Sequence, residues 1–115
     1  MPHCTIEYST PLETQIPPLK LVRELHTSIN ASGLFKEASI KVRSVGCDQY
    51  LVGGTLTNFA AILIRIFEGR TDEQKKALAD GVLKHMKEFI SSEAVISVEI
   101  KDITLAHYSK FVPED

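Results

Sequence analysis

The sequence predicts an α+β fold in which two βαβ units share one four-stranded sheet, in the order βαββαβ. Four short segments show period-two alternation or continuous apolar character. Two longer segments with three- and four-residue apolar spacing lie between the first and second and between the third and fourth of these. Each predicted helix is long enough to connect two parallel strands. With 115 residues, the chain is expected to form a single domain over residues 1–115.

The first predicted strand runs from Pro2 to Ser9, and proline is tolerated at such a first strand position. Alternation places Cys4, Ile6 and Tyr8 on one face of this strand. A connection with three prolines then leads to a helix that begins near Pro18. Its core-facing stripe consists of Leu21, Val22, Leu25 and Ile29. Gly33 predicts the end of this helix through a left-handed turn.

The second and third strands are predicted from about Ser39 to Val52 and from Phe59 to Phe67, separated by a turn at Gly53-Gly54. In the second strand, alternation places Lys41 and Arg43 on one face. The third strand is almost continuously apolar, which is typical of a strand buried on both faces.

A strand-to-helix corner follows, and it carries Arg70. Thr71 and Gln74 have the spacing of a capping box, so the second helix is predicted from Thr71 to about Ile90. Arg70 takes no part in this cap, and its cation is therefore available to a ligand. The fourth strand is predicted over Val95–Ile103 by alternation, and the segment after Ala106 has no assigned structure.

Two right-handed crossovers of this kind place both helices on one face of the sheet. The other face is then left uncovered, although the third strand is apolar on both sides. A large exposed apolar face favours association. We therefore expect an oligomer in which the sheets face inward.

Composition limits the possible partners. A formal charge of −2 gives no basic excess for binding nucleic acid or a membrane surface, and no apolar segment has the length of a membrane span. The chain start lacks the features of a signal peptide, so a cytoplasmic location is expected. Cys4 and Cys47 are expected to be reduced thiols in strands. The four histidines are scattered and predict no metal site.

Pro2 is the candidate for chemistry. Removal of Met1 before a small residue or proline is common, and it would leave Pro2 with a secondary amine. Nearby cations lower the pKa of such an amine towards neutrality, and Lys41, Arg43 and Arg70 are the candidate cations. An amine of this kind can abstract a proton beside a carbonyl and return it to another carbon. This isomerisation requires no cofactor. A retained Met1 would instead make the Pro2 nitrogen an amide, which is not a base.

Several segments resemble the tautomerase superfamily. Residues 68–75, EGRTDEQK, are similar to a corner in the 4-oxalocrotonate tautomerases, and residues 1–9, MPHCTIEYS, are similar to the opening of the 5-carboxymethyl-2-hydroxymuconate delta-isomerases. Residues 31–35 and 40–43 match the latter group in the same order. The resemblance covers most of the chain and implies a homotrimeric isomerase of aromatic-compound catabolism that acts on a small unsaturated keto or enol acid.

The resemblance also implies roles for individual residues. Pro2 becomes the general base and Arg70 binds a substrate carboxylate, while Lys41 and Arg43 occupy the family's Ile-Arg-x-Arg segment. An arginine pair could bind carboxylates and stabilise a dienolate. Here the first arginine is Lys41, a point charge rather than a planar fork, which makes Arg43 the stronger candidate. A catalytically inactive, carboxylate-binding protein of the same fold stays open as the alternative.

Overall fold

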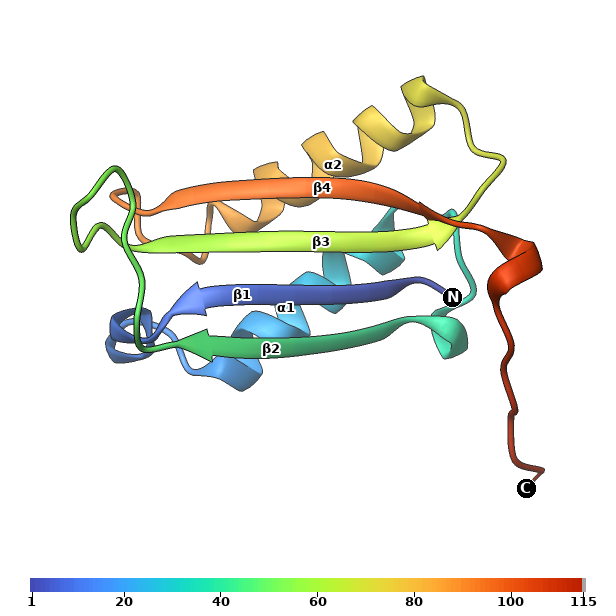
Figure 1. Ribbon diagram of the computed structural model, residues 1–115, viewed down its shortest axis with the longest axis horizontal. Coiled ribbons are helices and arrows are strands. Elements are labelled where there is room, and N and C mark those ends of the chain that lie inside the picture. The colour runs from blue at the N-terminus through green and yellow to red at the C-terminus, as the bar shows by residue number, and fades with distance from the viewer. Residues whose placement is uncertain (115) are drawn as a thin grey trace.

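The computed structural model describes residues 1–114 and confirms the α+β, βαββαβ prediction (Figure 1). The sheet is mixed and has the strand order β2-β1-β3-β4. Within each half the strands are parallel, β1 with β2 and β3 with β4, and the two halves meet through the antiparallel pair β1 and β3. The regular elements are β1 (His3–Ser9), α1 (Pro18–Ala31), β2 (Lys41–Cys47), β3 (Phe59–Phe67), α2 (Asp72–Met86) and β4 (Val95–Ile103).

The second strand is shorter than its alternation predicts. It ends at Cys47 instead of near Val52, because β2 lies at the sheet edge and pairs only with β1, whose last residue, Ser9, is opposite Cys47. Beyond that point no backbone partner remains in β1 for a continuing strand. The predicted turn at Gly53-Gly54 is present, and both glycines have positive φ, 59° and 79°.

The corner before α2 forms as predicted. The Thr71 hydroxyl accepts from the backbone N–H of Gln74 at 3.1 Å, and the Gln74 side chain accepts from the backbone N–H of Thr71 at 2.9 Å. This reciprocal pair is the predicted capping box. The helix proper ends at Met86, four residues earlier than expected, although the backbone N–H of Ile90 still donates to the Met86 carbonyl at 3.1 Å.

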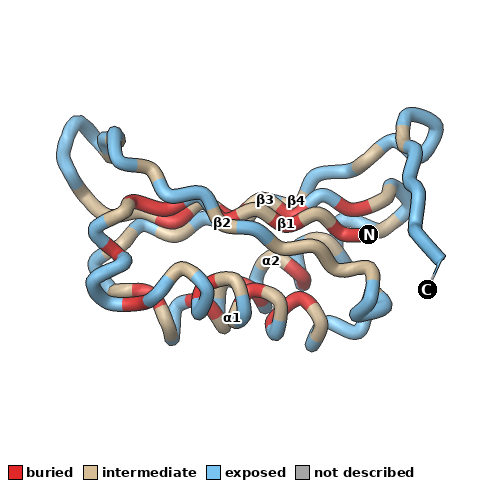
Figure 2. Tube along the Cα trace, turned by 90° about the horizontal axis from the view of Figure 1, so that it is seen from below, coloured by how far each residue is buried: buried red, intermediate tan, exposed pale blue. Residues whose placement is uncertain are grey.

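Both helices cover the same face of the sheet, as Figure 2 shows. The hydrophobic core lies between them and the sheet, and in β1 and β3 every second side chain points into it. The buried apolar strand residues are Cys4, Ile6, Tyr8, Ala60, Ile62, Ile64 and Ile66. The opposite face of β3 is half-buried or exposed, so burial of both faces of this strand is not achieved within one chain.

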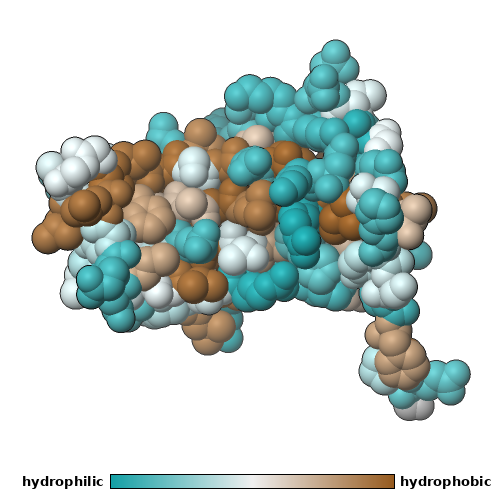
Figure 3. Space-filling model, viewed as in Figure 1, coloured by the Kyte–Doolittle hydropathy of each residue, from teal (hydrophilic) through white to brown (hydrophobic). Residues whose placement is uncertain are grey.

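The face without helices is divided between apolar and charged side chains (Figure 3). The strand register aligns four basic residues in one row across all four strands near the start of β1. These are Lys41, His3, Arg65 and Lys101. The loop at residues 48–58 and the carboxy-terminal segment rise from this face at opposite ends of the sheet (Figure 2). Within residues 1–114, no helix has the length and apolarity needed to cross a bilayer.

Candidate active site

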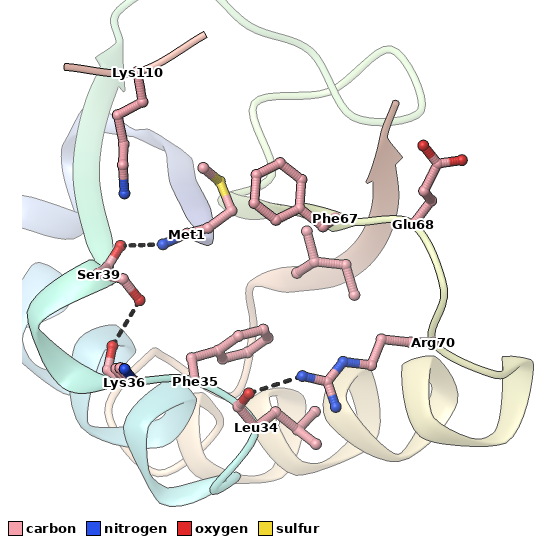
Figure 4. Close-up of a pocket in the computed structure, with 10 residues that line it drawn as sticks. Met1, Leu34, Phe35, Lys36, Ser39, Phe67, Glu68, Arg70 and Lys110 are labelled. Atoms are coloured by element: carbon pink, nitrogen blue, oxygen red, sulfur yellow. Dashed lines mark hydrogen bonds between the residues drawn. The ribbon is translucent and has the colours of Figure 1, made fainter. Parts of the chain in front are cut away.

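A pocket of about 410 Å³ opens where β1 begins and β3 ends. Three parts of the chain form it: the amino terminus, the turn after α1, and the corner between β3 and α2 (Figure 4). The carboxy-terminal segment adds one side chain, that of Lys110. Its lining residues are Met1, Leu34, Phe35, Lys36, Ser39, Ile66, Phe67, Glu68, Arg70 and Lys110.

The amino-terminal amine is held at this pocket by the Ser39 carbonyl. The Met1 amine donates to this oxygen at 2.7 Å, and the Lys41 ammonium donates to the same oxygen at 2.9 Å. Burial of the amine, and next the positive charges of Lys41 and Lys110, lower its pKa from 8.0 to about 6. An amine with this pKa is largely unprotonated at neutral pH, which a general base requires.

Pro2 follows Met1 in the chain, and its side chain is fully buried. Its carbonyl accepts from the backbone N–H of Lys41 at 3.1 Å, which extends the pairing of β1 with β2 by one residue. With Met1 in place, the Pro2 nitrogen is an amide. Met1 is 8% exposed and lines the pocket, whereas Pro2 is not among the lining residues.

Arg70 lines the pocket from the β3–α2 corner. The sequence alone indicated that its cation is free for a ligand, but in the structure the cation has partners within the chain. Its Nη2 donates to the Leu34 carbonyl at 2.9 Å, and its guanidinium lies 5.7 Å from the centre of the Phe35 ring. The corner and the turn after α1 are thereby joined. A guanidinium has five N–H donors, so this single bond leaves donors that can face the pocket.

Arg43 lies outside this pocket, on the open face of the sheet. Its Nη2 donates to His3 Nδ1 at 3.4 Å, and His3 Nε2 is joined to the Tyr108 hydroxyl at 2.9 Å. Since Nδ1 accepts, the neutral ring carries its proton on Nε2 and donates it to Tyr108. Burial and then the charge of Arg43 lower the pKa of His3, which favours this neutral form. Of the four predicted site residues, Arg70 lines the pocket, Lys41 and Pro2 lie next to the amine without lining the pocket, and Arg43 is apart from both.

The pocket carries mainly positive charge. Its charged side chains are Lys36, Arg70, Lys110 and one carboxylate, Glu68. That carboxylate accepts a hydrogen bond of 2.7 Å from the backbone N–H of Leu105, in the segment that follows β4. A cluster of cations with one engaged anion favours a negatively charged ligand.

Lys110 and Tyr108 are the residues that sequence reasoning missed. The segment that carries them has no alternation or helical spacing, and their partners lie at the opposite end of the chain. The only local signal is the pair of residue types itself, an aromatic residue and a lysine in an otherwise exposed tail.

Neither Cys4 nor Cys47 lines this pocket. Cys4 is fully buried in the core, as expected of a structural thiol, and burial raises its pKa to about 12. Among residues 1–114, no cluster of three or more histidine, cysteine, aspartate or glutamate side chains is arranged to hold a metal ion.

Comparison with known proteins connects this geometry to one family. The sequence matches the family profile of 5-carboxymethyl-2-hydroxymuconate isomerase over residues 2–110. A search of curated proteins finds no match.

Solved structures agree with this family in fold. A 5-carboxymethyl-2-hydroxymuconate delta-isomerase is 16% identical with a TM-score of 0.84, covering 97% of this chain and 89% of that chain. A 5-carboxymethyl-2-hydroxymuconate isomerase from Deinococcus radiodurans R1 is 27% identical with a TM-score of 0.78, covering 96% and 88%. A fused 4-OT symmetric trimer is 18% identical with a TM-score of 0.71, covering 89% and 85%. The resemblance seen in the sequence is therefore confirmed: the chain belongs to the 5-carboxymethyl-2-hydroxymuconate isomerase family and has a tautomerase-like fold.

Proposed function

We propose that the protein is a cofactor-independent isomerase that moves a proton on a small unsaturated keto or enol acid, such as a 5-carboxymethyl-2-hydroxymuconate-like compound. The observation that carries this proposal is the Met1 amine at the pocket, whose pKa is lowered to about 6 beside a cluster of cations. A neutral amine can accept the proton, and the cations can hold the acid and stabilise the enolate charge.

Pro2 is the proposed base, and its use requires removal of Met1. Loss of Met1 would convert the Pro2 nitrogen from an amide to a secondary amine and would vacate the part of the pocket that the Met1 side chain now lines. Burial and the charge of Lys41 lower the pKa of the Met1 amine. Lys41 is paired with His3 at the start of β1, so both effects would act on a Pro2 amine as well.

The cations have separate proposed roles. Arg70 binds a substrate carboxylate through the donors that its bond to Leu34 leaves unused. Lys41 keeps the amine unprotonated. Arg43 is proposed to stabilise negative charge on the substrate, although in a single chain it faces the open side of the sheet and is joined to His3.

We also propose a homotrimer. Both helices lie on one face of the sheet, and the other face presents half-buried apolar side chains such as Leu63. Copies that cover this face would bury those side chains and bring Arg43 close to a neighbouring chain. The fused 4-OT structure, a relative in fold, is described as a symmetric trimer, which supports this choice of oligomer.

The second candidate is a carboxylate-binding protein of the same fold without turnover. Two observations favour it: Lys41 stands where the family has an arginine, and one donor of Arg70 is engaged by the chain itself. Binding of an acid would then occur at the same cations, but no proton would be transferred.

The test is the intact mass of protein purified without an amino-terminal tag, followed by absorbance assays of enol-to-keto conversion with phenylenolpyruvate and 2-hydroxymuconate. The proposal expects a mass lacking Met1 and a Pro2→Ala variant that loses most of the turnover while still binding the acid. Retention of Met1 in the native host, or a Pro2→Ala variant as fast as the parent, contradicts the proline mechanism. Binding without turnover in the processed parent protein supports the second candidate.

A further inference from the structure

The carboxy-terminal segment returns to the amino terminus and is attached there. Tyr108 is hydrogen-bonded to His3 Nε2 at 2.9 Å, and its ring contacts Phe67 edge-to-face with 5.3 Å between ring centres. Arg43 supports the same site from β2 through its 3.4 Å contact with the other His3 nitrogen. Residues of β1 and β3 thus contact Tyr108, β2 contacts His3, and Phe67 is itself part of the pocket lining.

This attachment determines where the next side chains lie. Lys110 is two residues beyond Tyr108, and it lines the pocket although it is solvent-exposed, like most of this segment. Figure 4 shows Lys110 and Arg70 on different sides of the pocket, with Met1 between them. The charge of Lys110 is also one of those felt by the amine.

Lys41 and Lys36 are less well placed than Lys110 to bind a ligand on the side of the pocket away from Arg70. The ammonium of Lys41 is engaged by the Ser39 carbonyl at 2.9 Å. Lys36 also lines the pocket, but it comes from the turn after α1, next to the Phe35 ring that the Arg70 guanidinium overlies. Lys110 is therefore the cation that is separate from Arg70 and contributed by a different part of the chain.

We propose that Lys110 is a specificity-determining residue that binds a second carboxylate, and that Tyr108 positions it. The first carboxylate is on Arg70, so the pocket prefers an unsaturated dicarboxylate to the matching monocarboxylate. This inference rests on the proposed use of the pocket for an unsaturated acid. It assigns to the carboxy-terminal segment a role in selecting the ligand.

Two commercially available acids test the preference for a dicarboxylate. Muconate and sorbate share an unsaturated six-carbon chain, and sorbate has a methyl group where muconate has its second carboxylate. Calorimetry on the full-length protein should show that Lys110→Met weakens muconate binding by roughly three- to tenfold, as expected for one charge-assisted contact near solvent. Sorbate affinity should change by less than about twofold. Lys110→Arg should restore most of the preference, and Lys87→Met, an exposed lysine at the end of α2, should change neither affinity.

Tyr108→Phe tests the positioning step. It keeps the ring that contacts Phe67 and removes the hydroxyl that bonds to His3. The muconate-to-sorbate preference should fall in the same direction as in Lys110→Met, but by less, and the melting temperature should fall only slightly, since one hydrogen bond is lost.

The inference is overturned if Lys110→Met lowers both affinities equally, lowers neither, or if Lys36→Met removes the preference in its place. Because these are binding measurements, they separate this inference from the proposed reaction. A parent protein that prefers muconate through Lys110 but shows no turnover contradicts the isomerase alone, whereas turnover without a Lys110-dependent preference contradicts only the role of the carboxy-terminal segment.

Discussion

Replacing Arg70 with methionine should have two effects that can be measured separately, one on ligand binding and one on stability. Arg70 donates to the Leu34 carbonyl at 2.9 Å and lies 5.7 Å from the Phe35 ring, so the variant loses one hydrogen bond and one cation–π contact. These contacts together are worth about 1–2 kcal/mol of unfolding free energy at a half-exposed site. The loss should be seen as a lower midpoint in urea unfolding with an unchanged slope.

The binding effect of the same substitution should be larger. A hydrogen-bonded contact between a guanidinium and a carboxylate contributes about 1.5–3 kcal/mol, which corresponds to roughly 10- to 150-fold in the dissociation constant. Sorbate is the appropriate probe, because its single carboxylate is expected on Arg70. Arg70→Lys should retain part of the affinity, since it keeps the charge but not the planar fork.

A matched control is Arg23→Met, which removes an exposed arginine from α1, away from the pocket. It should leave sorbate affinity and stability unchanged. If Arg70→Met loses stability but binds sorbate as the parent protein does, Arg70 serves only to join the corner to the turn after α1. The assignment of the carboxylate site would then be refuted.

Three further outcomes are expected. An amine base works only when neutral, so kcat/KM should fall about tenfold per pH unit below the pKa of the Pro2 amine and level off above it; burial and the charge of Lys41, which lower the pKa of the Met1 amine, should hold this pKa below its ordinary value, and a profile without this acid limb contradicts an amine base. Cys4, fully buried and with its pKa raised to about 12, should react with a thiol reagent only after unfolding, whereas half-buried Cys47 should react in the native protein; two fast thiols would show that β1 opens readily. Ile64→Ala should lower the unfolding free energy by about 2–5 kcal/mol because it leaves a cavity in the core; if copies cover the open face as proposed, Leu63→Ala should also be costly, and a much smaller loss for Leu63→Ala would contradict that covering.

Sequence patterns predicted an element well where its bounds depend on residues within the element itself. The bounds of β3 agree with its almost continuous apolar run, those of β4 agree with the alternation of its apolar residues, and the Thr71–Gln74 capping box forms as its spacing predicts. The end of β2 could not be read in the same way. It depends on the length of β1, its only neighbour in the sheet, and not on the alternation within β2.

The candidate site was predicted only in part for a related reason. Pro2, Lys41 and Arg70 could be proposed from residue types and family resemblance. Their partners could not, because the bond between Arg70 and Leu34 spans 36 residues and that between His3 and Tyr108 spans 105. The hydrogen bond between His85 of α2 and Glu24 of α1, at 2.9 Å, likewise joins residues 61 positions apart.

The central claim, that a Pro2 amine is the base, is tested most directly by observing that nitrogen. Protein labelled with [15N]proline and purified without a tag should show one proline nitrogen with the chemical shift of an amine, titrating well below the ordinary value of about 8 for a terminal amine. Its pKa should match the acid limb of kcat/KM, and Lys41→Met should raise it, since the charge of Lys41 lowers the pKa of the amine at this site. Five amide-like proline signals with no titrating amine, in protein from its native host, would contradict the account.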